Sequence, residues 1–344
     1  MDLALDGRWF DMWWATSRVI PGFAIDEYPL WTALFADLHG HFIALPILLL
    51  TLLWGWMVVD LPGRRWLVAA GLAGICAAVL AATNPWDVFV LASALGVGTL
   101  MAAGRPIRGL LRLLAAGCAS VVAGLPYIVE LIAGIGAGAG GRGRFMTTAD
   151  FAPAWAVVVH FGQFLVPLIA LAVALLLSSR AWIVALPVAA AGVGLGVILG
   201  SSAAALALAS ATVMAMAALR TAGRAPRLMW SLAALAMVAV AACERFTLID
   251  RMNTIFKVYN GAWVLLAVAL GGLLICQRGW RRNLLAAVWL PLQLVALVNL
   301  PLGIAQGWLQ PRTASPRPTL DGQAFLAEED PQTWFVVRGL QGMA

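Results

Sequence analysis

The chain has 344 residues, of which 62% are hydrophobic and only 11% are charged. A soluble domain carries about 25% charged residues, so this chain cannot cover itself with polar surface and must use lipid as its solvent. The formal net charge is +6, but the arginines are dispersed between apolar runs, so we interpret them as loop residues and exclude nucleic acid as a partner.

Apolar runs long enough to cross a bilayer recur along the chain. A spanning helix needs about 17–25 apolar residues, and the sequence predicts spans at 42–59, 66–83, 87–103, 110–135, 154–177, 181–199, 202–219, 228–243, 258–276 and 284–305. We therefore predict an all-α fold, a polytopic bundle of about ten transmembrane helices. Residues 1–41 precede it as an outer interfacial segment, and residues 306–344 follow it as an outer, proline-rich tail.

The distribution of charge predicts the orientation. If the segment before the first span lies outside, the inner loops and adjoining helix ends hold a single acidic residue, Asp60. Every inner loop is then basic, as the positive-inside rule requires. We therefore expect a multi-pass protein of the plasma membrane with its N-terminal segment and C-terminal tail outside. The inner arginines are Arg64, Arg65, Arg105, Arg108, Arg112, Arg180, Arg220, Arg224, Arg227, Arg278, Arg281 and Arg282.

The first candidate site directly precedes the first span. It contains IDEYP at 25–29 and DLHGH at 37–41. Asp37, His39 and His41 are candidate metal ligands or acid/base groups, and in an extended segment all three share one face. In a helix only Asp37 and His41 align. The alternative interpretation is a helix start whose histidines lie at the headgroup level.

A second polar group is the turn NPWD at 84–87. This is the pattern of an ordinary helix start, with Asn84 as the N-cap, Pro85 at the first helical position and Asp87 at the third. A short turn of this kind can also line a site, so the capping and binding interpretations are compatible.

The third polar group is the segment 244–260. If a helix runs from Asp250, then Asp250, Asn253 or Thr254, and Lys257 fall on one face. Lys257 is the only lysine of the chain, and its ammonium can hold a phosphate as a point charge. The alternative is a capped helix with a snorkelling lysine. His160, alone in an apolar helix, is more often a packed, hydrogen-bonded residue than a functional one.

The placement of these groups bears on the class of function. They lie on one membrane face, which favours an enzyme that acts on a lipid-borne substrate, because transporters usually place ionisable groups near the membrane midplane. Glu130, within the run 110–135, is the main exception. It supports the alternatives, which are a transporter or flippase for a lipid or anionic solute and a non-catalytic membrane subunit.

Three stretches resemble the YYY family of integral membrane proteins. They are residues 13–22 continuing through 25–29 to 36–41, the turn at 84–87, and DRMNTIFKVY at 250–259 followed by Trp263. The resemblance covers about residues 10–340. That family is similar to the GT-C-fold glycosyltransferases, multi-span enzymes that take sugar from a polyprenyl-phosphate donor on the outer face, usually with a divalent metal and an acidic residue in an outer loop.

The resemblance implies a GT-C-like glycosyltransferase with membrane lipid and a polyprenyl-phosphate sugar lipid as its partners. An outer-loop carboxylate, Asp26, Glu27 or Asp37, would be the catalytic base. Asp37 with His39 and His41 would hold a divalent metal, Mg or Mn. The expected substrate-binding residues are Arg18, Asn84, Asp87, Asp250, Arg251, Asn253, Lys257 and Tyr259.

The chain departs from the family pattern in three respects. Asp26 stands where the family usually has asparagine, and Gly40 where it often has proline. Family members usually have further spans before the first stretch and a longer region after the last one. We therefore expect a fragment, a split protein completed by a protein partner, or an inactive relative.

Overall fold

The computed structural model describes residues 18–20, 24–27, 29, 39–136, 145–148, 151–248, 250–305 and 331–341. Asp37, one of the predicted catalytic and metal-binding residues, lies outside the described residues. The chain divides into two compact units, Met1–Leu292 and Gln293–Ala344, and each is described by itself. The candidate site and every pocket discussed below belong to the first unit.

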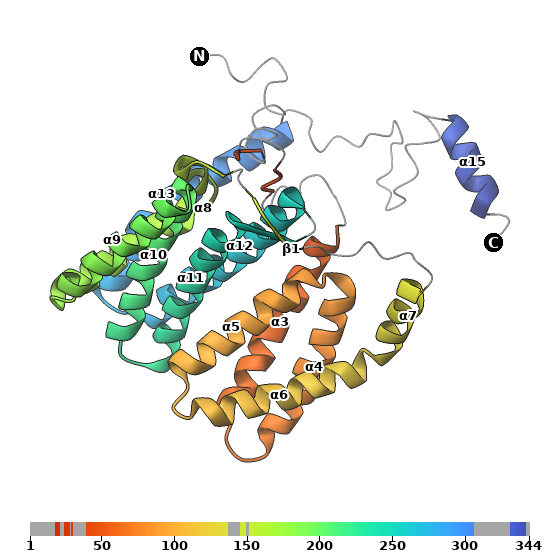
Figure 1. Cartoon of the computed structure of the whole chain (residues 1–344), viewed down its shortest axis with the longest axis horizontal. Coiled ribbons are helices and arrows are strands. Elements are labelled where there is room, and N and C mark those ends of the chain that lie inside the picture. Colours follow the sequence, from red (N-terminus) through yellow and green to blue (C-terminus); the bar gives the residue numbers. More distant parts are fainter. Residues whose placement is uncertain are drawn as a thin grey trace. The chain divides into compact units, whose positions relative to one another are not determined.

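The described chain is almost entirely helical (Figure 1). Helix α13 runs from the first unit into the second, and α15 belongs to the second unit. The elements are α3 (Gly40–Asp60), α4 (Arg65–Thr83), α5 (Trp86–Ala102), α6 (Pro106–Ala123), α7 (Leu125–Gly136), β1 (Phe145–Thr147), α8 (Ala154–Ser178), α9 (Trp182–Ile198), α10 (Ser202–Arg220), α11 (Arg224–Cys243), β2 (Phe246–Leu248), α12 (Arg251–Cys276), α13 (Trp280–Ala305) and α15 (Pro331–Gln341).

The predicted fold class, an all-α membrane helix bundle, is confirmed. Among the described helices, 7 are long and apolar enough to cross a membrane: α3, α4, α6, α8, α10, α11 and α12. Helices α5 and α9 are apolar but shorter. By this criterion the described residues fall short of the expected ten spans.

The single span expected at 110–135 is wrong, because two helices occupy it. Helix α6 ends at Ala123 and α7 begins at Leu125. The N–H of Gly124 bonds to the Ser120 carbonyl at 2.8 Å, and Pro126, the second residue of α7, has no N–H with which to continue the ladder. Figure 1 shows α7 turning away from α6. Hydropathy alone cannot detect such a break inside a continuous apolar run.

The main core lies between α8, α10, α11 and α12. Its largest fully buried side chains include Phe161, Met214, Trp230, Met237 and Tyr259. The facing surfaces of α10 and α11 are rich in alanine, and small residues let helix backbones approach closely in a membrane. These closely packed helices provide the frame on which the polar residues are held.

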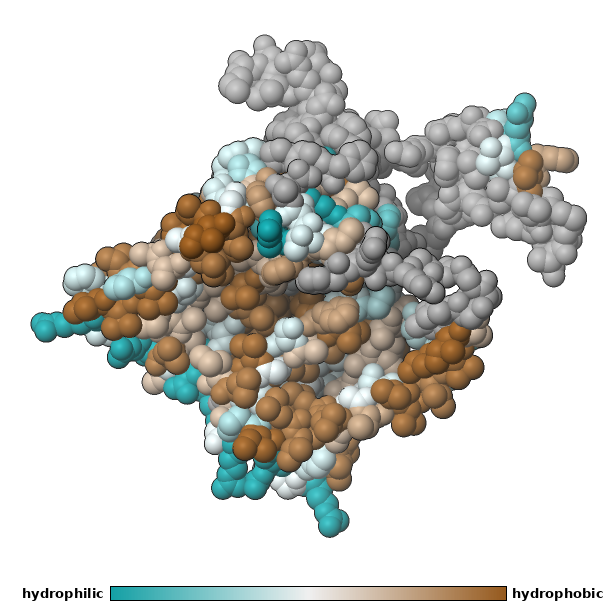
Figure 2. All heavy atoms as spheres, viewed as in Figure 1, coloured by the Kyte–Doolittle hydropathy of each residue, from teal (hydrophilic) through white to brown (hydrophobic). Residues whose placement is uncertain are grey.

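Arginine-bearing loops meet at one end of the bundle, here called the basic end. Arg224, at the start of α11, pairs with Asp60 at the end of α3 at 2.8 Å. Arg112 of α6 donates to the carbonyl of Leu61 at 2.9 Å. Figure 2 shows hydrophilic residues at this lower end, beyond a broad hydrophobic surface. Three of the predicted inner connections, α3–α4, α5–α6 and α10–α11, therefore lie together.

The opposite end, here called the site end, carries the small antiparallel sheet. Phe145 pairs with Leu248, and Thr147 pairs with Phe246. The sheet joins the chain before α8 to the connection between α11 and α12. It therefore fixes the entry into α12, the helix that carries the third polar group.

Candidate functional site

The site end encloses a buried pair of an acid and an imidazole. Oδ2 of Asp26 lies 3.4 Å from Nδ1 of His160 on α8, and both side chains are almost wholly inaccessible. Oδ1 of Asp26 accepts a hydrogen bond from the Val19 N–H at 3.0 Å. The pair fastens the N-terminal segment to α8. The Asp26 carboxylate, predicted to be a catalytic base, is thus engaged in the interior in this conformation.

A second buried carboxylate belongs to Glu244, directly after α11. Its Oε2 accepts hydrogen bonds from the Ala152 N–H at 2.6 Å and the Ser201 hydroxyl at 3.2 Å. Its Oε1 accepts one from the Tyr259 hydroxyl at 3.4 Å. Burial raises the pKa of Glu244 above its ordinary value, and the hydrogen bond from Ala152 opposes that shift. Glu244 thereby ties the starts of α8 and α10 to α12.

Tyr259 connects the two buried carboxylates. Its ring lies 5.4 Å from the His160 ring and 5.0 Å from the Phe161 ring, measured between centroids. The side chain is fully buried. Tyr259 was predicted to bind substrate, and in the structure its hydroxyl is buried and donates to Glu244.

The three polar stretches predicted from the sequence converge on Lys257. The carboxylates of Asp87 and Glu27 both attract its ammonium electrostatically. Glu27 is in turn held by Arg18, whose Nη1 lies 3.3 Å from Oε1, and both side chains remain partly exposed. Glu27, Asp87 and Lys257 thus come from the N-terminal segment, α5 and α12 to one place. Of these three residues, Glu27 was the one predicted to be catalytic, and its carboxylate is partly exposed.

The turn at 84–87 differs from its predicted capping geometry. Helix α5 begins at Trp86, its N-cap is Pro85, and no side chain caps it. Asn84 is instead the C-cap residue of α4. The side chains of Asn84 and Asp87 are both buried and interact with each other. The prediction was wrong because the preceding helix runs to Thr83, which leaves Asn84 to end one helix and not to begin the next.

The start of α12 agrees with the capped-helix interpretation. Oδ1 of Asp250 accepts from the Asn253 N–H at 2.7 Å, and its Oδ2 accepts from the Asn253 side chain at 2.7 Å. The Thr254 hydroxyl accepts from the Leu248 N–H at 2.8 Å. Asp250 and Asn253, both predicted to bind substrate, thus hold the helix start. The Arg251 guanidinium lies close enough to Glu244 to act on its carboxylate.

A groove of about 270 Å³ opens beside Lys257, between α5, α11 and α12. Lys257 is the one charged residue in a lining that is otherwise almost entirely apolar. The Lys257 Nζ also lies 4.4 Å from the centre of the Phe256 ring. A hydrocarbon chain fits such a groove, and the ammonium at its edge attracts an anionic head. The lining residues are Trp86, Phe89, Val90, Ser93, Leu235, Ala239, Leu248, Lys257, Val258, Gly261, Ala262 and Leu265.

The predicted metal ligands are placed only in part. His39 precedes α3, and its ring lies 5.4 Å from the ring of His41. His41 is buried against Phe256. Within the described ranges no group of three or more His, Cys, Asp and Glu residues could hold a metal ion. Two imidazoles alone do not make a site for Mg or Mn, which prefer oxygen ligands.

Two residues of the site were not among the predicted site residues. His160 was interpreted as a packed histidine, and the structure shows that its packing partner is a buried carboxylate. Glu244 belongs to the third polar stretch but was not singled out. The available signal was its position, since an acid directly at the end of an apolar helix requires partners for its charge.

Comparison with known proteins gives one finding. The model of the family described as "Uncharacterized membrane protein (DUF2298)" matches residues 2–266. No curated protein and no solved structure matches the chain.

Proposed function

The chain belongs to the DUF2298 family of membrane proteins, and from that premise we propose that it is a membrane glycosyltransferase that takes its sugar from a polyprenyl-phosphate donor. The single observation that carries the proposal is the position of Lys257. It lies at the edge of an apolar groove and within electrostatic reach of Glu27 and Asp87. The resemblance of three sequence stretches to relatives of GT-C enzymes supports the same reaction class.

The groove and Lys257 would bind the two parts of one donor. The polyprenyl chain would lie along the apolar walls of α5 and α11, and its phosphate would meet the ammonium. A lysine suits this task because its ammonium has three rotatable N–H donors and a flexible stem. It can therefore keep its hydrogen bonds to the phosphate while the polyprenyl phosphate departs as the leaving group. Asp87, buried beside Asn84, would hold Lys257 at the groove.

Glu27 would be the base toward the acceptor hydroxyl. Its carboxylate would take the hydroxyl proton while the acceptor oxygen forms a bond to the anomeric carbon. The bond between that carbon and the phosphate oxygen would break, and the polyprenyl phosphate would leave with the electron pair, stabilised by Lys257. Arg18 would position Glu27, and the buried Asp26–His160 pair would hold the segment that carries both.

A divalent metal belongs to this proposal as a further expectation. His39 and His41 would supply two ligands and Asp37 a third. A bound metal would neutralise charge on the leaving phosphate. No step above depends on it. Under the proposed orientation the site end faces outward at the plasma membrane.

Two measurements on the gently purified protein test the proposal. Native mass spectrometry is expected to show retained polyprenyl phosphate or its sugar conjugate. Proteoliposomes containing labelled polyprenyl-phosphate sugars, both hexoses and pentoses, are expected to show transfer to an acceptor. Lys257→Met, which keeps most of the length of the side chain but not its charge, is expected to lose both signals. Lys257→Arg, which keeps the positive charge, is expected to retain most of the bound lipid.

The matched control is Arg278→Met, at the end of the bundle remote from the groove. It is expected to behave as the wild type. Retention of ordinary phospholipids alone, with the wild type and Lys257→Met indistinguishable, would refute the donor site. Movement of the labelled lipid across sealed vesicles without covalent change would favour the flippase alternative. The residue on which that alternative was based, Glu130, is exposed on α7.

A further inference from the structure

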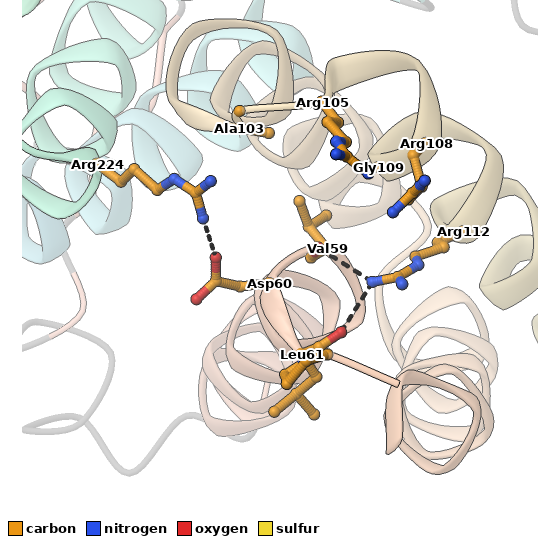
Figure 3. A pocket seen from close by; sticks show the side chains of 11 residues that line it. Val59, Asp60, Leu61, Ala103, Arg105, Arg108, Gly109, Arg112 and Arg224 are labelled. Atoms are coloured by element: carbon orange, nitrogen blue, oxygen red, sulfur yellow. Dashed lines mark hydrogen bonds and ion pairs between the residues drawn. The ribbon is translucent and has the colours of Figure 1, made fainter. Parts of the chain in front are cut away.

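The basic end contains a polar pocket of about 290 Å³ that is separate from the candidate site. It lies between the end of α3, the start of α6 and the start of α11 (Figure 3). Four guanidinium groups line it and one carboxylate opposes them, so its walls carry an excess of positive charge. These charged residues are Arg105, Arg108, Arg112, Arg224 and Asp60.

Two of the four arginines are already engaged. Arg224 pairs with Asp60 at 2.8 Å, and Arg112 donates to backbone carbonyls, among them that of Leu61 at 2.9 Å. Arg224 also packs against Gly104, where a side chain would collide with its guanidinium. These contacts build the wall of the pocket and fix its shape.

The other two arginines are available to a ligand. Within the described residues, the guanidinium groups of Arg105 and Arg108 have no hydrogen bond or ion pair. Figure 3 shows both at the start of α6, Arg105 as its N-cap residue, with their side chains extending toward the same space that Arg112 enters. An anion at this place would gain charge-assisted hydrogen bonds from groups that nothing else in the described chain satisfies.

An apolar groove of about 230 Å³ lies near this pocket and shares no lining residue with it. It lies one helical turn farther along the same helices, since Trp56 precedes Asp60 by four residues on α3 and Leu228 follows Arg224 by four on α11. Its outer wall contains Leu49 and Leu53, which are about half exposed, so it opens to the surrounding lipid. A free phosphate ion has no apolar part that such a groove could bind, whereas a lipid has acyl chains.

We infer that the basic end binds an anionic phospholipid. Its phosphate headgroup lies among Arg105, Arg108 and Arg112, and an acyl chain lies in the groove beside Trp56. Basic pockets between transmembrane helices at the cytoplasmic side bind anionic headgroups in this way. The site would take a lipid of the leaflet opposite to the proposed donor, and it does not depend on the proposed glycosyl transfer.

Native mass spectrometry of the delipidated protein, titrated with phosphatidylglycerol, tests the inference. Arg105→Gln/Arg108→Gln is expected to weaken phosphatidylglycerol binding about thirtyfold, from the attraction lost at two arginines. Arg278→Gln/Arg282→Gln removes two arginines at the connection between α12 and α13 that do not line the pocket, and is expected to leave binding unchanged. Leu53→Trp, which narrows the groove, is expected to weaken lipid binding but not the binding of inorganic phosphate. Phosphatidylcholine, which is zwitterionic and has no net charge, serves as the comparison lipid.

Each result decides the question. Loss of phosphatidylglycerol in the pocket double variant, with retention in the control double variant, supports the site. Equal loss in both double variants shows attraction to the basic end as a whole and overturns it. Inorganic phosphate that competes fully, together with no effect of Leu53→Trp, overturns the lipid as the ligand. Melting curves of all variants in detergent check that the fold is intact. We expect it to be intact in the pocket variant, because both of its arginines are exposed.

Discussion

Nδ1 of His160 lies 3.4 Å from Oδ2 of Asp26, and neither side chain is more than 1% exposed. The two residues are separated by much of the first unit in sequence, so their contact fastens the N-terminal segment to α8. A buried polar pair of this kind contributes to stability only while both partners remain. The pair therefore holds Glu27, the next residue, at the candidate site.

We predict that Asp26→Ala and His160→Ala each destabilise the protein and that their effects are not additive. Each substitution leaves one buried polar group unsatisfied, at a cost of about 1–3 kcal/mol in the free energy of unfolding. In a double-mutant cycle the coupling should exceed about 0.5 kcal/mol. The measurement is denaturant unfolding in detergent.

The exposed pair Asp60–Arg224 is the control for this cycle. Because solvent screens it, its coupling should be small. Equal coupling in the two cycles would contradict the assignment of a special structural role to Asp26 and His160.

The raised pKa of Glu244 predicts a pH dependence of stability. Burial favours the protonated acid, so the folded chain keeps this proton at pH values where the unfolded chain has released it. The stabilisation is complete below the ordinary pKa of glutamate and is lost as the pH rises through the raised folded value. In Glu244→Gln this contribution is absent. Melting temperatures from about pH 4 to about pH 8 should therefore fall more for the wild type than for the variant.

Parallel melting curves for the two proteins would show that Glu244 does not titrate in this range.

Much of the fold follows from the sequence because hydropathy reports helices directly. The run predicted at 154–177 is α8 (Ala154–Ser178) to within one residue. Pro153 stands before this uninterrupted apolar stretch, and polar residues from Ser178 onward follow it. The break between α6 and α7 depends on Gly124 and Pro126, which lie inside an equally apolar stretch. Local backbone chemistry, and not polarity, decides that boundary.

The candidate site, like the fold, could be predicted from the sequence only in part. Lys257, Glu27 and Asp87 were predicted to lie at one membrane face because the positive-inside rule puts the segments that carry them outside, and the structure brings them together. The partners of Glu244 were not predictable. Ala152 is 92 residues away from it in sequence and Ser201 is 43 residues away, and only the packing of α8, α10 and α11 makes them neighbours.

We predict that the cap of α12 stabilises the helix that carries Lys257. Asp250→Ala removes the acceptor for the Asn253 N–H and should cost about 1 kcal/mol in the free energy of unfolding. Asp250→Ser restores an acceptor and should recover most of that loss. An equal loss in both variants would show that the Asp250 charge, and not its capping oxygen, matters at this position.

Glu27 provides the test that separates chemistry from binding at the proposed site. If Glu27 is the base, Glu27→Gln should lower the rate of sugar transfer by about a hundredfold or more, while polyprenyl phosphate remains bound in native mass spectra. Arg18→Gln should have a smaller effect on the rate, because it releases Glu27 from one orientation but leaves its carboxylate in place. Loss of bound lipid in Glu27→Gln would assign this residue to donor binding instead.

The proposed orientation predicts which end of the bundle a membrane-impermeant maleimide reaches in intact cells. Phe246, exposed in β2 at the site end, and Arg64, exposed in the loop between α3 and α4 at the basic end, are suitable positions for an introduced cysteine. Because basic loops remain cytoplasmic, Phe246→Cys should be labelled from outside, and Arg64→Cys only after the cells are opened. The wild type controls for the native cysteines, of which Cys118 and Cys276 are exposed on apolar helices. The reverse pattern would place the candidate site in the cytoplasm and rule out a polyprenyl-phosphate donor on the outer face.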